Sequence, residues 1–347
     1  MRRLAILATL AASTTLAACT TVPAGPAVKT AVVAARAETH PVGTANQDAA
    51  DDPAIWRNAA NPAGSLLVGT DKKAGLYAYG LDGAVRSFVP AGQLNNVALV
   101  EGRHGILVAA SDRTDPLNSR VAFFALDRNT GALTSLGQVA SGPGEAYGLC
   151  MVAQSGGDGA DGARVYAALK DGSVREIAVS YAPGRLTGAI TREWKIPTQI
   201  EGCVVDETAN RLFVGEEMVG IHAFDLNTAD AKPTLFAKAD RRQLVADVEG
   251  LALASLPDGR RILLASSQGD NAYAAYDAVS GHFLGRFRIG DGAIDGTSET
   301  DGIDVVIGDF GPGFPGGLFV AQDGDNGGGT QNFKLVAWDD IAAALGL

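Results

Sequence analysis

Charged and polar side chains recur at two positions of a pattern that repeats six times along this 347-residue chain. The first position lies beside the start of a short apolar segment and is occupied by Asp51, Asp52, Tyr147, Glu201, Asp247, Glu249 and Asp301. The second position follows the next apolar segment and is occupied by Lys72, Arg113, Lys170, Glu216 with Glu217, Gln268 and Asp323. The early repeats therefore supply cations at the second position, whereas the later repeats mostly supply carboxylates.

The two kinds of side chain indicate two kinds of ligand. Carboxylates that converge on one place repel one another unless protons or cations lie between them. Their oxygen atoms, with no Cys or His interleaved, favour calcium or another hard cation over zinc. Lys and Arg side chains bind phosphate oxygens. A polyphosphorylated substrate could use both groups, although each residue taken singly would be an ordinary solvated charge.

Short strands in a regular order are expected to position these side chains. The six starts, at residues 51, 95, 147, 201, 249 and 301, are 44, 52, 54, 48 and 52 residues apart. Each start leads into an apolar strand, a turn, a second strand rich in Leu and Val, and a third strand, and most repeats offer a fourth. This period is typical of propeller blades. We predict an all-β, six-bladed β-propeller with four-stranded antiparallel blades around a central channel.

The last repeat lacks an obvious fourth strand, because only residues 341–347 remain after the third. A propeller closes its ring by pairing its first and last blades. The apolar residues 30–35 could supply the missing strand, and the alternative is that they extend a disordered tether. We place the propeller at residues 43–347, a tether at 19–42 and a leader at 1–18.

The leader has the features of an export signal. Arg2 and Arg3 precede the apolar residues 4–10, and residues 16–19 read LAAC, which is typical of bacterial lipoproteins. We predict a lipid on Cys19 that anchors the protein in the bacterial cell envelope, in the periplasm, at the outer membrane or on the surface. The alternative is an ordinary signal peptide cleaved nearby, which would give a secreted protein.

The formal net charge of the chain is −11. An acidic protein of this size is a poor candidate for binding nucleic acid through its phosphates. We therefore expect no nucleic-acid partner. We also expect contact with a membrane only through the lipid, and a monomer.

Several long motifs resemble those of one family, the β-propeller phytases. The motifs are DDPAIW at 51–56, KKAGL at 72–76, LNNV at 94–97, EGCV at 201–204, DVEGL at 247–251, IDGTSETDGID at 294–304 and FVAQDG at 319–324. The resemblance extends from about residue 43 to the C-terminus. It implies a calcium-dependent phosphomonoesterase, a 3-phytase, that hydrolyses phytate (myo-inositol hexakisphosphate) or its calcium complex by direct attack of a calcium-held water. The products would be lower inositol phosphates and inorganic phosphate.

The resemblance also assigns roles, residue by residue. The phosphate-binding residues would be Lys72, Arg113, Tyr147, Lys170 and Gln268. The carboxylates that hold catalytic calcium would be Glu201, Glu217, Asp247, Glu249 and Asp301. The ligands of structural calcium would be Asp52, Asp295, Asp323 and Asn332. The choices between Asp51 and Asp52 and between Glu216 and Glu217 stay open. The Gly-rich stretch 324–331 departs from the family pattern, which weakens the case for structural calcium there.

Two other functions and one covalent feature stay open at this point. A six-bladed calcium-dependent lactonase or arylesterase would need a deep apolar channel, which the cations fit badly. A non-catalytic propeller would use calcium only for stability. Cys150 and Cys203 lie on the first strands of neighbouring repeats, so they form either a disulfide or a pair of buried thiols.

Overall fold

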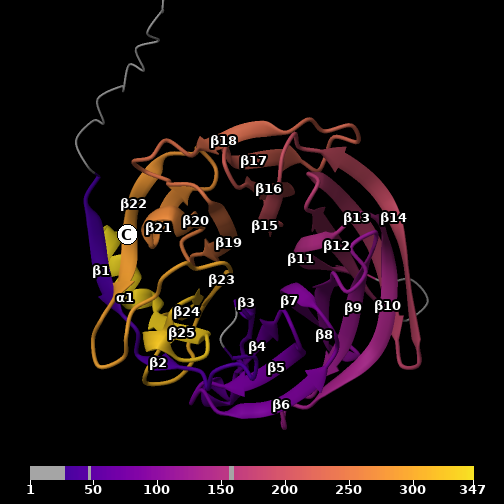
Figure 1. Cartoon of the computed structure of the whole chain (residues 1–347), viewed down its shortest axis with the longest axis horizontal. Coiled ribbons are helices and arrows are strands. Elements are labelled where there is room, and N and C mark those ends of the chain that lie inside the picture. The colour runs from indigo at the N-terminus through magenta and orange to yellow at the C-terminus, as the bar shows by residue number, and fades with distance from the viewer. Residues whose placement is uncertain (1–27, 46–47, 156–159) are drawn as a thin grey trace, which may run out of the picture.

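The computed structural model describes residues 28–45, 48–155 and 160–347, and the predicted lipid site at Cys19 lies outside these ranges. Six β-sheets stand around one central axis, as Figure 1 shows. Each sheet contains four antiparallel strands, and one of them carries a fifth strand. The predicted fold, a six-bladed propeller of four-stranded blades, is confirmed.

The first three blades follow the chain without interruption. Blade 1 contains β3 (Ala50–Trp56), β4 (Leu66–Asp71), β5 (Gly75–Gly80) and β6 (Val85–Pro90), with a 3-10 turn at Pro62–Gly64. Blade 2 contains β7 (Leu94–Gly102), β8 (Gly105–Asp112), β9 (Asn118–Leu126) and β10 (Leu133–Pro143). Blade 3 contains β11 (Ala146–Ser155), β12 (Asp161–Leu169), β13 (Ser173–Ala182) and β14 (Arg185–Lys195).

The last three blades include strands from both ends of the chain. Blade 4 contains β15 (Ile200–Asp206), β16 (Arg211–Glu216), β17 (Gly220–Asp225) and β18 (Thr234–Lys238). Blade 5 contains β19 (Val248–Ser255), β20 (Arg261–Ser267), β21 (Ala272–Asp277), β22 (Phe283–Gly290) and the added β1 (Thr30–Ala34), with a 3-10 turn at Gln268–Asp270. Blade 6 contains β23 (Ile303–Ile307), β24 (Gly317–Asp323), β25 (Asn332–Ala337) and β2 (Ala37–Glu38), with a 3-10 turn at Asn326–Gly328.

The N-terminal segment closes the ring, but not through the strand that the sequence suggested. β1 pairs in parallel with β22 of blade 5, and the short β2 pairs with β25 as the fourth strand of blade 6. Residues 30–34 thus extend a neighbouring blade, and Ala37–Glu38 complete the last one. Both strands precede residue 43, where we expected the propeller to begin. They pair there because the outer edges of blades 5 and 6 offer free backbone groups to an extended segment.

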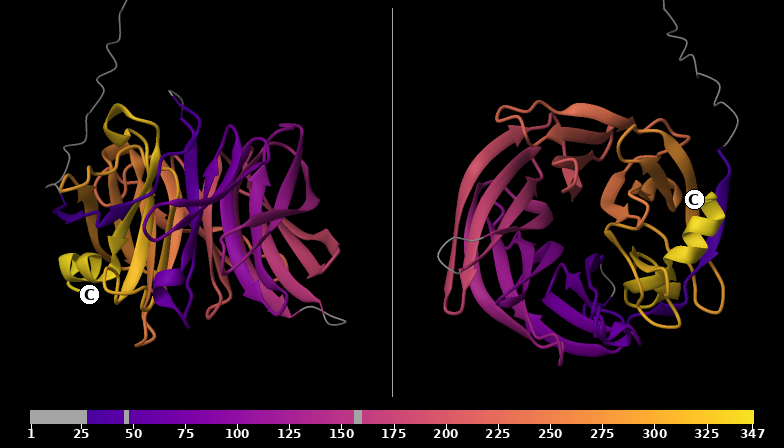
Figure 2. Two further views of the ribbon diagram at one scale, coloured as in Figure 1. Left: turned by 90° about the horizontal axis from the view of Figure 1, so that it is seen from below. Right: turned by 180° about the vertical axis from the view of Figure 1, so that it is seen from behind.

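A short helix ends the chain. α1 (Trp338–Leu345) follows directly after β25, the third strand of blade 6, and it packs beside β1, as the right panel of Figure 2 shows. Trp338 and Ile341 are buried in one apolar cluster with Val33 of β1. The two termini of the described chain therefore share a core that covers blades 5 and 6. No helix in the described ranges has the length and apolar composition needed to cross a membrane.

The apolar cores lie between neighbouring blades. One cluster, for example, joins Tyr166 and Trp194 of blade 3 to Leu212 and Phe224 of blade 4. The alternation of side chains along each strand places one apolar face of a blade against the next blade. Every junction is therefore held mainly by apolar packing, which keeps the first strands in a fixed order around the axis.

Candidate active site

An irregularity at the start of the first strand aims side chains at the axis. In blade 1 the pairing with β4 jumps from Ala50 to Pro53, so Asp51 and Asp52 lie in a bulge. The same jump precedes Val97, Leu149, Cys203 and Leu251 in blades 2 to 5. A bulge bends its strand and redirects the side chains of the unpaired residues. The first bulged residues and their equivalent in blade 6 form a ring at one end of the axis, consisting of Asp51, Asn95, Tyr147, Glu201, Glu249 and Asp301.

A second ring follows from the strand that pairs with each first strand. The backbone N–H of Lys72 donates to the carbonyl of Ala49 at 2.7 Å, and Arg113, Lys170, Glu217 and Gln268 make the equivalent bond in blades 2 to 5. These five side chains therefore start from equivalent points beside the first ring. The structure brings together the predicted residues Lys72, Arg113, Tyr147, Lys170, Glu201, Glu217, Glu249, Gln268 and Asp301.

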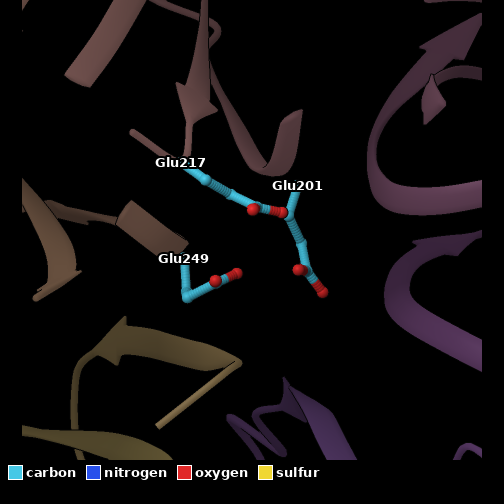
Figure 3. Close-up of side chains that lie close together, drawn as sticks. All are labelled: Glu201, Glu217 and Glu249. Atoms are coloured by element: carbon cyan, nitrogen blue, oxygen red, sulfur yellow. The ribbon is translucent and has the colours of Figure 1, made fainter. Parts of the chain in front are cut away.

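Three glutamates form a carboxylate cluster, two of them from the first ring and one from the second. One oxygen from each of Glu201, Glu217 and Glu249 lies within 4.8 Å of the others. Figure 3 shows that the three side chains point toward one another. Glu201 and Glu249 are each 5% exposed, whereas Glu217 is half-buried and accepts a hydrogen bond of 2.5 Å from Gln199. Asp247 lies close enough to Glu217 to raise its pKa further after burial.

The cluster binds protons when no cation is present. Burial, followed by repulsion from Asp51, raises the pKa of Glu201 to about 7. Burial and the charge of Glu201 raise the pKa of Glu249 well above its ordinary range. Burial also raises the pKa of Asp301. The site therefore holds closely spaced carboxyls that favour either a proton or a metal ion between them.

Lys72 connects the first and last blades. Its ammonium lies 3.0 Å from Asp51, 2.7 Å from Asp301 and 2.8 Å from Asp48, and the side chain is 9% exposed. Burial lowers the pKa of Lys72, but these three carboxylates together raise it above its ordinary value. Gln268 donates to the other oxygen of Asp301 at 2.7 Å. Lys72 is thus a charged group with fixed partners, not a freely moving surface lysine.

The remaining cations surround Tyr147. The Arg113 guanidinium lies 5.3 Å and the Lys170 ammonium 5.0 Å from the centre of its ring. Burial, and then the charge of Glu201, keep the pKa of the Tyr147 phenol far above its ordinary value, so the hydroxyl stays neutral. This half of the ring presents two cations and a phenolic hydroxyl, which are groups that bind phosphate oxygens.

Asn95 is a site residue that we did not predict. Its side-chain oxygen accepts from Arg113 at 2.6 Å, and its amide nitrogen donates to Glu201 at 2.9 Å and to Asn96 at 3.0 Å. The side chain is fully buried. It therefore joins the basic half of the ring to the carboxylate cluster. The sequence signal was its position in the repeat, which is equivalent to that of Glu201.

The structure separates the two adjacent pairs that the sequence left open. Glu216 ends β16 and bonds to Thr198 and His222, at 3.0 Å from the Thr198 N–H and 2.7 Å from the imidazole, whereas Glu217 joins the cluster. Successive side chains of a strand point to opposite faces, so only one of two neighbours can reach the axis. In blade 1, Asp51 bonds to Lys72, and Asp52 accepts from the Val97 N–H of blade 2 at 2.9 Å. Burial raises the pKa of Asp52.

The repeat pattern predicted Asp323 at the second ring, but the structure places it outside that ring. Within the blades it corresponds to Asp71 and Glu216, which end their second strands, not to Lys72 or Glu217. Its carboxylate accepts from the Ser298 N–H and lies 3.3 Å from the ammonium of Lys334. The one-residue offset moves it from the ring to the opposite face of the strand.

Three of the four expected ligands of structural calcium, Asp295, Asp323 and Asn332, lie around this lysine, whereas Asp52 lies in blade 1 against blade 2. The fully buried Lys334 ammonium lies 2.5 Å from Asp295, 2.6 Å from Glu38 and 2.9 Å from the side-chain oxygen of Asn326. Asn332 donates its amide N–H to Glu38 at 2.9 Å. Burial lowers the pKa of Lys334, but the bonds to Asp295 and Glu38 raise it overall. In this arrangement the Lys334 ammonium already neutralises these carboxylates. The residues around Lys334 therefore fit a divalent ion less well than the carboxylate cluster does.

The carboxylate cluster does fit a hard divalent cation. Its donors are carboxylate oxygens only, which suit calcium or magnesium better than zinc. One oxygen of Glu249 and one of Asp51 are buried without a hydrogen-bond partner. Buried polar atoms normally have a partner, so these oxygens mark a place where a cation would complete the site.

Comparisons with known proteins decide the class of chemistry. The model of the phytase family matches residues 3–347. The chain belongs to the phytase family. A 3-phytase of Bacillus subtilis (strain 168) is 39% identical over 330 residues, which cover 90% of this chain and 85% of that protein. The WD40 domain of SCAP from fission yeast matches with a TM-score of 0.46 and 11% identity over 82% of this chain and 64% of its own, which is too distant to inform function.

Membership of the phytase family makes this protein a phosphoric monoester hydrolase, as the sequence resemblance implied. The cations and the neutral Tyr147 hydroxyl lie on one side of the ring and the carboxylate cluster lies on the other. The family match favours this phosphatase over the lactonase and the non-catalytic propeller considered above.

Proposed function

We propose that this phytase family member hydrolyses phytate in a calcium-dependent reaction at the ring. The observation that carries the proposal is the carboxylate cluster of Glu201, Glu217 and Glu249 beside the cations Arg113 and Lys170. Phytate has many phosphate groups, and such a substrate can place one phosphate at the cluster and others on the cations. The name of the Bacillus relative supports the same substrate.

Glu201, Glu217 and Glu249 would hold calcium, with Asp51, Asp247 and Asp301 nearby. Bound calcium would neutralise phosphoryl charge and make a water molecule a better nucleophile. Lys72 neutralises Asp51 and Asp301, the two carboxylates of the first ring that lie beside the cluster. The carboxylates would bind calcium fully only after they lose their protons. We therefore expect activity to rise from acidic to neutral pH.

Arg113, Lys170 and Tyr147 would position the phosphates of the substrate. The guanidinium can donate two parallel hydrogen bonds to one phosphate, and the ammonium of Lys170 can bind a second. The neutral Tyr147 hydroxyl can donate a hydrogen bond without adding negative charge. Asn95 orients Arg113 and Glu201 together. No residue of the ring needs to form a covalent phosphoenzyme.

We infer that the protein acts outside the cytoplasm, held to the cell envelope by a lipid on Cys19, and that it works as a monomer. The disulfide between Cys150 and Cys203 supports an oxidising compartment.

Phosphate release from phytate, p-nitrophenyl phosphate and a lactone, each with calcium or with EGTA, tests the proposal. We expect rapid calcium-dependent release from phytate and little turnover of the lactone. Glu217→Gln should reduce kcat at least a hundredfold, because the cluster loses a charge. The matched control is Glu216→Gln, one residue away on the opposite face, which should stay within about threefold of the wild type. Full activity after complete removal of calcium would refute the metal assignment.

A further inference from the structure

A covalent bond joins blades 3 and 4 at the axis. Cys150 on β11 and Cys203 on β15 form a disulfide, with their Cα atoms 5.6 Å apart. Among the described residues it is the one disulfide. Both cysteines pack in the apolar cluster that fills the junction of these two blades.

The disulfide lies on a border between two functional halves. Blades 1 to 3 carry Lys72, Arg113 and Lys170, whereas blades 4 and 5 carry the carboxylate cluster. At the border between blades 6 and 1, Lys72 pairs with Asp301 across the junction at 2.7 Å. At the border between blades 3 and 4, the link is Cys150–Cys203. Both borders of the ring thus have a specific connection in addition to apolar packing.

The two sulfur atoms are close in sequence to residues of the site. Tyr147 precedes Cys150 by three positions, and Glu201 precedes Cys203 by two. The bulged backbones also touch, since a Cβ on Gly148 would lie 1.8 Å from the carbonyl oxygen of Glu201. A change in the spacing of β11 and β15 would therefore move Tyr147 relative to Glu201.

The disulfide borders the central channel. Cys150 and Cys203 are each 7% exposed and line a cavity of about 230 Å³ on the axis, together with Asn96, Gly202 and Glu207. The link is therefore a candidate for reduction in the folded protein, since thiol–disulfide exchange depends on access to the sulfur.

We propose that the Cys150–Cys203 disulfide is a redox-sensitive positioning link that holds the phosphate-binding half of the ring at its working distance from the carboxylate cluster. A dithiol reductant attacks one sulfur and the S–S bond breaks. The second thiol of the reductant then resolves the mixed disulfide. The reductant gives two electrons and two protons to the protein, which then carries two thiols. The oxidised reductant leaves as a cyclic disulfide. The predicted effect on turnover depends on the proposed function, whereas the effect on the two strands does not.

Reduction with dithiothreitol in saturating calcium, at a temperature well below the unfolding transition, tests the proposal. A thiol reagent should detect two additional thiols. We expect kcat/KM for phytate to fall about tenfold and the calcium concentration for half-maximal activity to rise about threefold, because displacements near 1 Å can cost up to about a hundredfold in rate. Oxidised glutathione should restore both values. The double variant Cys150→Ala/Cys203→Ala should behave like the reduced protein and show no further response to dithiothreitol.

Hydrogen exchange provides a readout that needs no turnover. Amides of 146–155 and 200–206 should exchange faster after reduction, whereas those of β3 and β23, the first strands on either side of the opposite border, should not change. If reduction unfolds the whole protein at the assay temperature, the link is only a stability element and the proposal is wrong. It is equally wrong if the reduced protein keeps its kinetics, calcium response and exchange pattern. If the oxidised protein does not hydrolyse phytate, the proposed function fails, and the exchange data alone then decide whether the link constrains the two strands.

Discussion

In calcium-free protein, the free energy of unfolding should fall as the pH rises from about 5 to 8. In the metal-free cluster the pKa of Glu201 is about 7, against an ordinary value of 4.5. Between these two values the folded protein holds a proton that the unfolded chain has lost. Raising the pH removes this proton from the folded state and leaves unbalanced charge beside Glu249, so the free energy of unfolding decreases. The raised pKa values of Asp52 and Asp301 act in the same direction.

The expected size follows from the shift. One pKa unit corresponds to about 1.4 kcal/mol, so the shift of Glu201 corresponds to a loss on the order of 3 kcal/mol once the pH exceeds 7. For a chain of this length, this loss should lower the Tm by roughly 5 °C. Calcium should reverse the trend, because the deprotonated carboxylates bind the ion and binding stabilises the folded state.

Thermal unfolding of calcium-stripped protein, followed by circular dichroism at constant ionic strength, would measure the effect between pH 5 and 8. Glu201→Gln is the matched variant, since it keeps the shape of the side chain but cannot titrate. Its Tm should depend less on pH than that of the wild type. A stripped wild-type protein whose Tm stays constant or rises from pH 5 to 8 would refute the reasoning, and so would a Glu201→Gln variant with the same slope.

Three further predictions concern the fixed partners of the site. Lys334→Met should lower the free energy of unfolding in calcium-free buffer by about 2 kcal/mol, because it leaves Asp323 without its cation; urea denaturation measures this, and unchanged stability would contradict it. Lys72→Met should lower the Tm by several degrees and kcat/KM for phytate by about ten- to a hundredfold, since Asp51 and Asp301 lose their partner. An unchanged Tm would show that the buried ion pairs of Lys72 do not stabilise the fold. Asn95→Leu should cost about 1–3 kcal/mol of stability and at least tenfold in kcat/KM, and kinetics like those of the wild type would exclude a positioning role for Asn95.

The blade count and the ring positions could be predicted because both depend on local order along the chain. Each repeat carries its own strands and turns, so the starts at 51, 95, 147, 201, 249 and 301 predict six similar units. A propeller places equivalent positions of its repeats around one axis. Glu201 and Glu249 could therefore be expected to meet, although no local feature of either segment shows the other.

The N-terminal strands could not be assigned with the same success. Residues 30–34 and 37–38 are short, and their partners lie about 250 to 300 residues away. An extended segment can pair with any free strand edge, so its apolar composition did not determine which blade it would join. The tertiary structure decides between blades 5 and 6 through the apolar core that Val33 shares with Trp338.

The sequence alone determined that this protein is a six-bladed propeller with cations in its early repeats and carboxylates in its late ones, because repeat period and residue type are local properties of the chain. Only the tertiary structure decided which of two neighbouring residues faces the axis, since a bulge or a one-residue offset changes the face of a strand. It also decided that Glu217 and not Glu216 joins the cluster, and that Asp323 pairs with Lys334. The tertiary structure also decided that Cys150 and Cys203 form a disulfide, because the bond depends on the distance between two strands of different blades.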